Sequence, residues 1–298
     1  MTSLAVLKSR ALAGMEAQAV SVEVHLANGL PGFTIVGLAD TEVKEAKDRV
    51  RAALQNGGFE FPAQRITVNL APADLPKESG RFDLPIALGI LAASRQIPAK
   101  HLHQYEFAGE LSLSGELRPI RGALAMSLAT RRDGGTLAFI LPRANADEAA
   151  LVANAAIYPA DTLTQVCAHF AAKSMEAMLS RHDAAPLAAA AAYPDFADVK
   201  GQVFAKRALE VAAAGCHSIL LVGPPGAGKT MLASRFVGLL PQMTDAEALE
   251  AAAVQSLVGG FRIEQWKQRP FRSPHHTSSG AALVGGGCQF QIKRRFFT

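Results

Sequence analysis

The chain has 298 residues, of which 49% are apolar and 19% are charged. This composition excludes a disordered or fibrous chain and suits about two folded domains. The net charge of +4, from 30 Lys and Arg against 26 Asp and Glu, permits a nucleic-acid partner without requiring one.

Cysteine use and hydropathy indicate the compartment. Cys167, Cys216 and Cys288 form neither a C-x-x-C pair nor a metal-ligand spacing, which favours a reducing environment. Charged residues interrupt the N-terminal stretch, so we expect no signal peptide. The longest apolar runs, 84–93 and 187–193, are too short to cross a bilayer. We therefore expect a cytoplasmic protein with no membrane partner.

The first 60 residues predict three strands and a helix. Strands are expected at 4–11, 17–26 and 33–38, and the second alternates clearly between apolar and polar residues. Asp40 can cap a helix that runs to about Gln55. The apolar residues expected on one strand face and on one helix stripe are Val20, Val22, Val24 and Leu26, and Val43, Ala46, Val50 and Leu54. His25 is interpreted as a strand-face residue rather than a ligand.

The next 115 residues continue this mixture of helices and strands. A strand at 66–70 precedes a polar loop and a helix at 82–94, and a hairpin of 107–112 with 116–120 turns at Ser114-Gly115. The remaining elements are then expected to alternate, as helix 123–132, strand 137–141, helix 145–153, strand 156–159 and helix 162–171. Residues 1–175 are therefore predicted to form a mixed α+β domain with its own sheet.

A linker and a second domain follow. Residues 176–194 include an alanine run bracketed by Pro186 and Pro194, which is typical of an interdomain linker. The second domain is expected over 195–298, and its first helix over 203–214.

The second domain contains a phosphate-binding motif. Residues 223–230 match G-x-x-x-x-G-K-S/T, after an apolar run at 219–222 that predicts a buried parallel strand and before a predicted helix at 231–240. In such a loop the backbone N–H groups surround a phosphate, Lys229 reaches the β- and γ-phosphates and Thr230 offers its hydroxyl to Mg²⁺. The predicted ATP and Mg²⁺ site comprises Gly223, Pro224, Pro225, Gly226, Ala227, Gly228, Lys229 and Thr230. A glycine-rich turn that only joins a strand to a helix is the alternative.

Several longer stretches resemble one family. Residues 198–202 and 223–230 look like the entry to an AAA+ module, and residues 32–40, 65–77 and 269–277 resemble the ComM/YifB family of magnesium-chelatase-like AAA+ proteins. The resemblance implies an α/β and α+β protein. Its N-terminal domain would be Lon-protease-like (ribosomal S5 domain 2-like, the ChlI type) and would precede a partial AAA+ P-loop NTPase domain.

The same resemblance implies a hexameric ATP-driven DNA helicase that promotes branch migration during natural transformation. It also implies that Val199, Gly201 and Gln202 lie near the adenine. Two other functions stay open. One is a chelatase-type motor subunit that drives metal insertion into a tetrapyrrole, against which the Lon-like domain argues. The other is a non-enzymatic interaction module that uses the N-terminal domain alone.

The likeness to Lon raises the question of proteolysis. When the Lon-like segments are aligned on Gly109, the catalytic serine position falls on Asp83 and the lysine position on Met126. Neither side chain can replace the serine–lysine pair, so we expect no peptidase activity. Lys77 and Ser79 are expected in a flexible loop without a base arrangement.

The segment after the P-loop mixes basic and aromatic residues. These are Phe261, Arg262, Trp266, Lys267, Arg269, Phe271 and Arg272. They suit either contacts to a nucleic-acid backbone and bases or an amphipathic segment packed on the domain. The pair His275-His276 is interpreted as having a structural or intersubunit role, since no Cys or carboxylate ligand stands at metal-ligand spacing.

After Gly287 the chain departs from the family pattern. Residues 288–298 do not lead into an apolar strand ending in Asp-Glu, the Walker B element that holds Mg²⁺ and polarises water. We therefore expect a truncated, hydrolysis-deficient ATPase without sensors or an arginine finger.

Overall fold

A computed structural model describes residues 3–14, 16–37, 40–133, 137–172, 177–183 and 193–274. The chain divides into two compact units. The first comprises residues 1–186 and 252–263, and the second comprises 187–251 and 264–298. Residues 252–263, which we had expected in the second domain, thus belong to the first unit.

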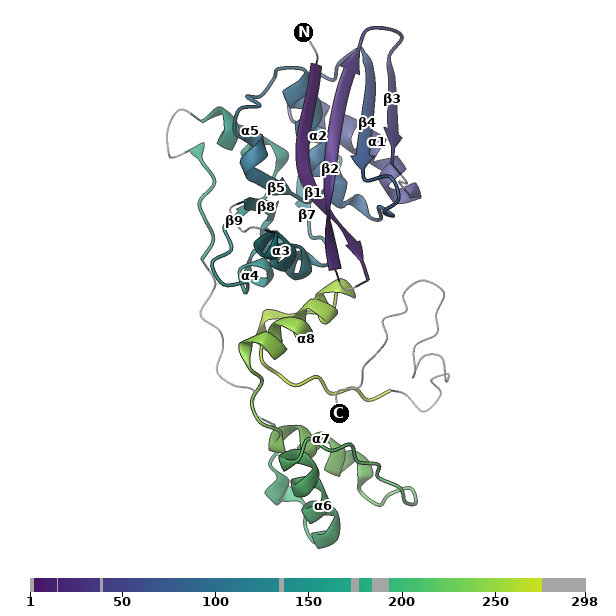
Figure 1. Cartoon of the computed structure of the whole chain (residues 1–298), viewed down its shortest axis with the longest axis vertical. Coiled ribbons are helices and arrows are strands. Elements are labelled where there is room, and N and C mark those ends of the chain that lie inside the picture. The colour runs from purple at the N-terminus through teal and green to yellow at the C-terminus, as the bar shows by residue number, and fades with distance from the viewer. Residues whose placement is uncertain are drawn as a thin grey trace. The chain divides into compact units, whose positions relative to one another are not determined.

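The first unit is built on a seven-stranded sheet of order β3-β4-β2-β1-β5-β8-β9 (Figure 1). Its strands are β1 (Ser3–Ala13), β2 (Glu16–Ala27), β3 (Gly32–Val36), β4 (Arg65–Ala71), β5 (Tyr105–Phe107), β8 (Ala138–Pro142) and β9 (Ile157–Ala160). The β1–β2 and β2–β4 pairs are antiparallel, and the other pairs are parallel. A separate antiparallel pair joins β6 (Glu110–Leu111) to β7 (Leu117–Arg118).

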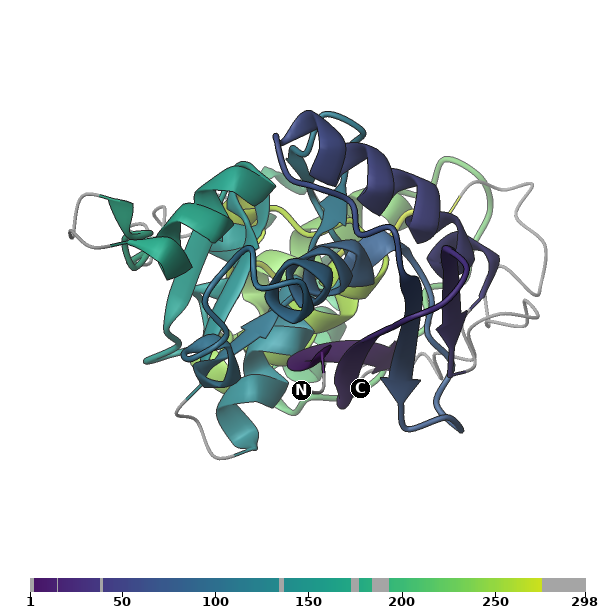
Figure 2. The same ribbon diagram turned by 90° about the horizontal axis from the view of Figure 1, so that it is seen from above.

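The α-helices that lie wholly within the described residues of this unit are α1 (Thr41–Asn56), α2 (Asp83–Ala93), α3 (Ala123–Arg132), α4 (Ala146–Ala149) and α5 (Leu163–Ala171). Figure 2 shows α1 and α2 on one face of the sheet. All eleven residues of α2 are buried. The helix is apolar on every side except at Asp83, as expected for a helix enclosed on all sides.

The parallel half of the sheet is covered on both faces. Ile140 of β8 joins the large core with α2 and α5, whereas its neighbours Phe139 and Leu141 join a second core with α3 and α4. Successive residues of a strand point to opposite faces, so β8 is buried on both sides. In the antiparallel half, by contrast, Leu4 and Val6 of β1 are 53% and 50% exposed on the face opposite α2.

Most predicted elements of this unit are confirmed. The four predicted apolar residues of β2 are at most 3% exposed, and the four of the α1 stripe are fully buried. The Oδ1 atom of Asp40 accepts the backbone N–H of Val43 at 2.8 Å, which is the predicted N-cap. The alternation and the cap could be predicted from the sequence because each depends only on residues within or next to its own element. The mixed α/β fold class is likewise confirmed.

Two predicted element boundaries were wrong. The strand expected at 107–112 is broken after Phe107, because the backbone N–H groups of Ala108 and Gly109 bond to Ile140 and Arg81 instead of to a hairpin partner. The helix expected at 145–153 is limited to α4, and the chain then turns through Asn154, whose φ is 61°.

The described residues of the predicted linker contact the first unit. Residues 177–183 are bonded to the first unit, where His182 forms an isolated antiparallel bridge with Ile157. The Ala-rich residues 184–192 lie outside the described part of the chain.

The second unit contains α6 (Val203–Ala214), α7 (Lys229–Leu239) and the first two turns of α8 (Asp245–Leu257). One small core joins Val199, Leu209 and Leu232, and another joins Met243, Ala248 and Ala251 with Trp266. Across the described residues of both units, no helix is both long and apolar enough to cross a membrane.

The strand predicted at 219–222 was wrong. Residues 217–222 have no regular secondary structure, and Leu220 and Val222 are each 85% exposed. A parallel strand requires neighbouring strands to bond its backbone, and the described residues of this unit contain none. Only Leu221 of this run packs against the core of Val199 and Leu232.

Candidate nucleotide-binding site

The predicted P-loop leads directly into a helix. α7 begins at Lys229, and its N-cap residue is Gly228, with φ 80°. Gly226 has φ 81°, so both glycines occupy the left-handed region that other residues adopt at a cost. Because the first amides of a helix have no partner within it, residues 229–231 present N–H donors at the positive end of α7.

The Lys229 side chain folds back over the loop. Its ammonium donates hydrogen bonds to the carbonyl oxygens of Gly223 at 2.8 Å and Pro224 at 2.7 Å. The loop therefore holds the cation beside the amides of the helix start. Thr230 is exposed at the same helix end, where its hydroxyl can reach a cation in solvent.

The segment predicted to lie near the adenine does meet the P-loop. Gln202 donates its side-chain amide to the carbonyl oxygen of Ala227 at 3.2 Å. Gly201 and Gln202 have φ values of 68° and 55°, which turn the chain into α6. Val199 is 1% exposed, because it belongs to the core beneath the loop rather than to its surface.

An ion pair that the sequence did not predict joins the same two segments. The Nη2 atom of Arg235, on α7, lies 3.3 Å from Oδ2 of Asp198. The residues are 37 positions apart and match no motif, so no sequence signal marked the pair. It holds the 195–202 segment against the helix of the P-loop.

The basic and aromatic segment is partly engaged in packing. Trp266 contacts the core of Met243, Ala248 and Ala251. Lys267 lies 2.5 Å from Asp245, and Arg269 donates its Nε–H to the carbonyl of Pro241 at 2.8 Å.

These contacts favour the amphipathic interpretation for Trp266, Lys267 and Arg269. Phe271 is 47% exposed, so its ring is available to a partner. The pair His275-His276 and Cys288 lie outside the described residues.

In the first unit, the position aligned with the Lon serine is a buried carboxylate. Asp83 accepts from Nε of Arg49 at 2.7 Å and from the backbone N–H of Leu111 at 3.2 Å. Burial raises the pKa of Asp83 to about 6, although Arg49 opposes the shift. Met126, at the aligned lysine position, places its sulfur 3.8 Å from Arg81.

The loop of Lys77 and Ser79, which we expected to be flexible, is packed at Lys77. Lys77 is fully buried, its ammonium donates to the carbonyl of Pro72, and burial lowers its pKa. The Ser79 hydroxyl accepts from Nε of Arg81 at 2.8 Å. The lysine and the serine therefore bond to different groups.

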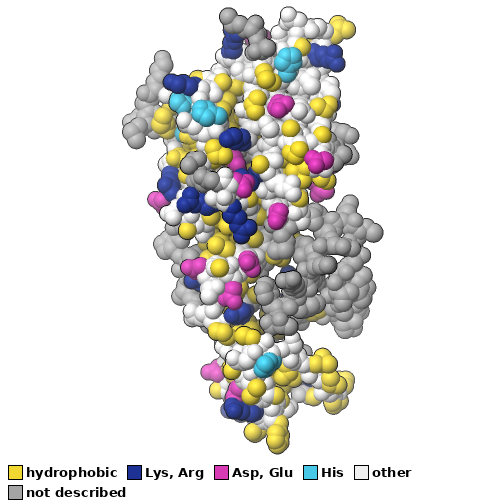
Figure 3. Space-filling model, viewed as in Figure 1, with side chains coloured by type: hydrophobic (Ala, Val, Ile, Leu, Met, Phe, Trp, Pro, Cys, Tyr) yellow, Lys and Arg dark blue, Asp and Glu magenta, His cyan; other side chains and the backbone are white. Residues whose placement is uncertain are grey.

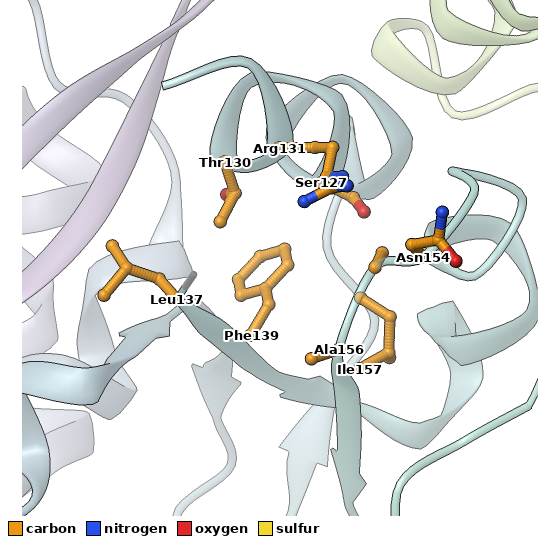
Figure 4. A pocket seen from close by; sticks show the side chains of 9 residues that line it. Ser127, Thr130, Arg131, Leu137, Phe139, Asn154, Ala156 and Ile157 are labelled. Atoms are coloured by element: carbon orange, nitrogen blue, oxygen red, sulfur yellow. The ribbon is translucent and has the colours of Figure 1, made fainter. Parts of the chain in front are cut away.

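A small pocket lies between α3 and the β8–β9 edge (Figure 4). Its hydroxyl groups already have partners, since Ser127 donates to the carbonyl of Ala149 at 2.8 Å and Thr130 donates to Glu106 at 2.6 Å. We assign no function to this pocket.

Basic and acidic side chains are interspersed on the visible face of the first unit (Figure 3).

Comparison with known proteins identifies the family. A family model described as subunit ChlI of Mg-chelatase matches residues 22–145, and one described as magnesium chelatase, subunit ChlI, matches residues 195–293. The chain is 53% identical over 297 residues to Competence protein ComM of Haemophilus influenzae. The chain belongs to the magnesium-chelatase-like ComM/YifB family.

Other members show similar agreement. The chain is 51% and 50% identical to the proteins named YifB of Salmonella typhimurium and Escherichia coli. Each match covers 96% of this chain but 56% of the relative, so the chain spans little more than half the length of these ComM/YifB proteins.

Proposed function

We propose that this ComM/YifB-family chain binds ATP with Mg²⁺ through residues 223–230. The observation that carries the proposal is the Lys229 ammonium, held 2.7–2.8 Å from two loop carbonyls at the start of an eleven-residue helix. Anions are stabilised at such a helix end by the exposed amides and the helix dipole. The residues present therefore fit a triphosphate.

Each P-loop residue has a stated role in this proposal. The amides of residues 226–230 would bond to phosphate oxygens, and Lys229 would exchange its carbonyl partners for the β- and γ-phosphates. The Thr230 hydroxyl would bind Mg²⁺, which neutralises phosphate charge when bound. Gly201 and Gln202 are proposed to border the adenine, because Gln202 already bonds to the loop.

The wider role is proposed from the family. A relative named a competence protein supports a part in DNA uptake or recombination, and we propose an ATP-driven motor that acts on DNA as a hexamer, with branch migration as its activity. The Lon-like character of the first unit belongs to the same proposal. Porphyrin-dependent stimulation of the ATPase in a full-length relative would instead favour the chelatase-type motor.

We further propose that the 298-residue polypeptide, taken alone, hydrolyses ATP slowly. After Thr230 it carries four carboxylates, Asp245, Glu247, Glu250 and Glu264, and none of them ends a β-strand. Asp245 pairs with Lys267, and Glu247 accepts from the backbone N–H of Thr244. A turnover of about 1 s⁻¹ or more, as in ordinary enzymes, would contradict this proposal.

A second candidate function uses the first unit alone as an interaction module. The 85% exposure of Leu220 and Val222 favours it, because a weakly folded second unit would not hold nucleotide. Nucleotide binding by the polypeptide decides between the two candidates.

The test is calorimetric titration of the purified polypeptide with ATP and ADP in the presence of Mg²⁺. We expect Lys229→Ala to weaken binding by at least about tenfold, since it removes a charge-assisted contact. Lys206→Ala is the control, because it removes a lysine whose ammonium lies over the Phe196 ring, 5.9 Å from the ring centroid. Equal binding by wild type and Lys229→Ala would contradict the proposal.

A further inference from the structure

The two edges of the seven-stranded sheet in the first unit differ. At the β9 edge, the backbone N–H of His182 donates to the carbonyl of Ile157 at 2.8 Å, and Pro159 has no N–H to offer. At the other edge β3 pairs with β4 alone, and no described strand lies on its outer side (Figure 1). Unpaired backbone groups attract a further strand, so an uncovered edge is a candidate interaction surface.

The β3 edge lacks the residues that usually discourage pairing. Natural edge strands are often protected by charged side chains, by proline or by a bulge. Residues 28–37 contain no charged side chain, and their one proline, Pro31, precedes the strand. Leu30 and Val36, near the two ends of the strand, are 89% and 43% exposed. An uncharged, partly apolar edge suits another uncharged strand better than it suits a charged polymer.

The register of β3 against β4 fixes which backbone groups face outward. The N–H of Gly32 donates to the carbonyl of Gln64 at 3.4 Å, so Gly32 and, two residues later, Thr34 bond to β4. The N–H and C=O groups of Phe33 and Ile35 then point away from β4. The edge therefore offers two donors and two acceptors, placed symmetrically about Thr34, whose side chain is exposed.

We propose that this edge pairs with the β3 edge of a second copy of the chain, antiparallel and about a two-fold axis at Thr34. In this register Phe33 of each copy exchanges two hydrogen bonds with the partner's Ile35, so all four outward groups of each chain are bonded. An axis at Ile35 would place Gly37, whose φ is 103°, opposite an outward residue. An axis at Phe33 would place Pro31 there, which has no N–H.

The side chains suit pairing with their own copies. A residue on a two-fold axis faces itself, so a charged side chain there would repel its copy, whereas Thr34 is neutral and Thr–Thr pairs are favourable across antiparallel strands. Val36 would face the partner's Gly32, which has no side chain. A five-residue edge is smaller than a standard interface, so the dimer is weak and depends on concentration.

This contact is separate from the assembly and the activity proposed above. A two-fold contact joins the same surface of two chains, whereas a ring is built from head-to-tail contacts, so the β3 pair does not form the proposed hexamer. All the residues involved belong to the first unit, and the contact does not rest on ATP binding.

Sedimentation equilibrium of the 298-residue polypeptide without nucleotide tests the dimer. The mean mass should rise from monomer towards dimer with concentration. Thr34→Lys should raise the dissociation constant by about tenfold or more, because two ammonium groups then face each other. Thr34→Ser, which stays neutral and keeps the hydroxyl, should leave it nearly unchanged.

His25→Lys is the matched control. It places the same charge at an exposed position of β2, an interior strand of the sheet. We expect this variant to dimerise as the wild type does. A monomer at every concentration, association that survives Thr34→Lys, or an equal loss in His25→Lys would each overturn the proposal.

Hydrogen exchange on the wild type locates the contact without any variant. Where about four-fifths of the chain is dimeric, exchange at the Phe33 and Ile35 amides should be about fivefold slower than in dilute protein, since they exchange from the monomer. The Thr34 amide, bonded to β4 in both states, should not change. Association without slower exchange at Phe33 and Ile35 would overturn the β3 contact and leave the proposed nucleotide binding standing.

Discussion

Asp83 shows at the scale of one residue how burial outweighs pairing. The carboxylate is fully buried and bonds to Arg49, yet its pKa is raised to about 6 because desolvation disfavours the charged form. Its folded pKa therefore lies above its unfolded value of 3.8. The stability that this group contributes is present below pH 3.8 and is lost as the pH rises through 6.

Asp83→Asn should remove this pH dependence. The unfolding free energy of the variant minus that of the wild type should become more positive as the pH rises from 4 to 7. The expected change is on the order of 3 kcal/mol, because each pKa unit is worth about 1.4 kcal/mol. Urea denaturation followed by circular dichroism measures it. Asp161→Asn, in an exposed pair with Arg143, is the control. A difference that stays constant with pH would contradict this account of Asp83.

The partners of buried charged residues could not be predicted from the sequence. Arg10 is 2% exposed and lies 2.7 Å from Glu106, which is 96 positions away, and 2.7 Å from Asp133. Such a pair depends on which strands and helices become neighbours, and no local pattern encodes that. The P-loop residues could be predicted because their motif is contiguous in the sequence.

At the scale of the element, residues 177–183 are held to the first unit by two histidines. His169 accepts the backbone N–H of Leu179 at its Nδ1 atom at 3.0 Å, and its Nε2 atom lies 3.0 Å from the Tyr105 hydroxyl. His182 pairs with Asp147 at 2.7 Å. Burial lowers the pKa of His169, so protonation opposes the folded state.

Protection of the Leu179 amide should therefore depend on pH. A folded pKa below the unfolded value of 6.5 means that the stability is present above pH 6.5 and is lost as the pH falls through the folded pKa. Hydrogen exchange at Leu179, corrected for the intrinsic pH dependence, should rise below about pH 6.5. In His169→Phe that rise should be absent. A wild-type amide equally protected at pH 5 and pH 7.5 would refute the role of His169.

Residues 219–222, before the P-loop, show why a strand cannot be predicted from its own sequence alone. The pattern of β2 predicted a strand correctly because its pairing partners, β1 and β4, lie in the same unit. The run at 219–222 has the same apolar, β-branched character, but no described strand lies beside it. Strand formation depends on partners distant in sequence, whereas a helix satisfies its own hydrogen bonds.

Substitutions in this segment should therefore be tolerated. Leu220→Lys and Val222→Lys should each change the stability of the polypeptide by less than about 0.5 kcal/mol, as at other exposed sites. Leu232→Ala, in the core under the P-loop, should cost about 2–5 kcal/mol. Thermal unfolding compares the three. A loss for the lysine variants as large as that for Leu232→Ala would mean that the segment is buried in solution.

At the scale of the whole molecule, two units share one chain in an order that the sequence did not suggest. Residues 252–263 belong to the first unit, where Ser256 donates a hydrogen bond to Glu148, 108 positions away in the sequence. Family membership and the fold class were predictable from contiguous motifs and local periodicity. The DNA-directed motor remains a proposal, because the chain spans 56% of the relatives that carry the family's names.

The central claim is that residues 223–230 hold the phosphates of ATP. The most direct test is hydrogen exchange of the 298-residue polypeptide with and without Mg²⁺ and ATP, resolved over the peptide of residues 223–232. We predict that ATP protects the amides of 226–230 in the wild type and not in Lys229→Ala. Binding of ATP without protection of these amides, or equal protection in Lys229→Ala, would contradict the account.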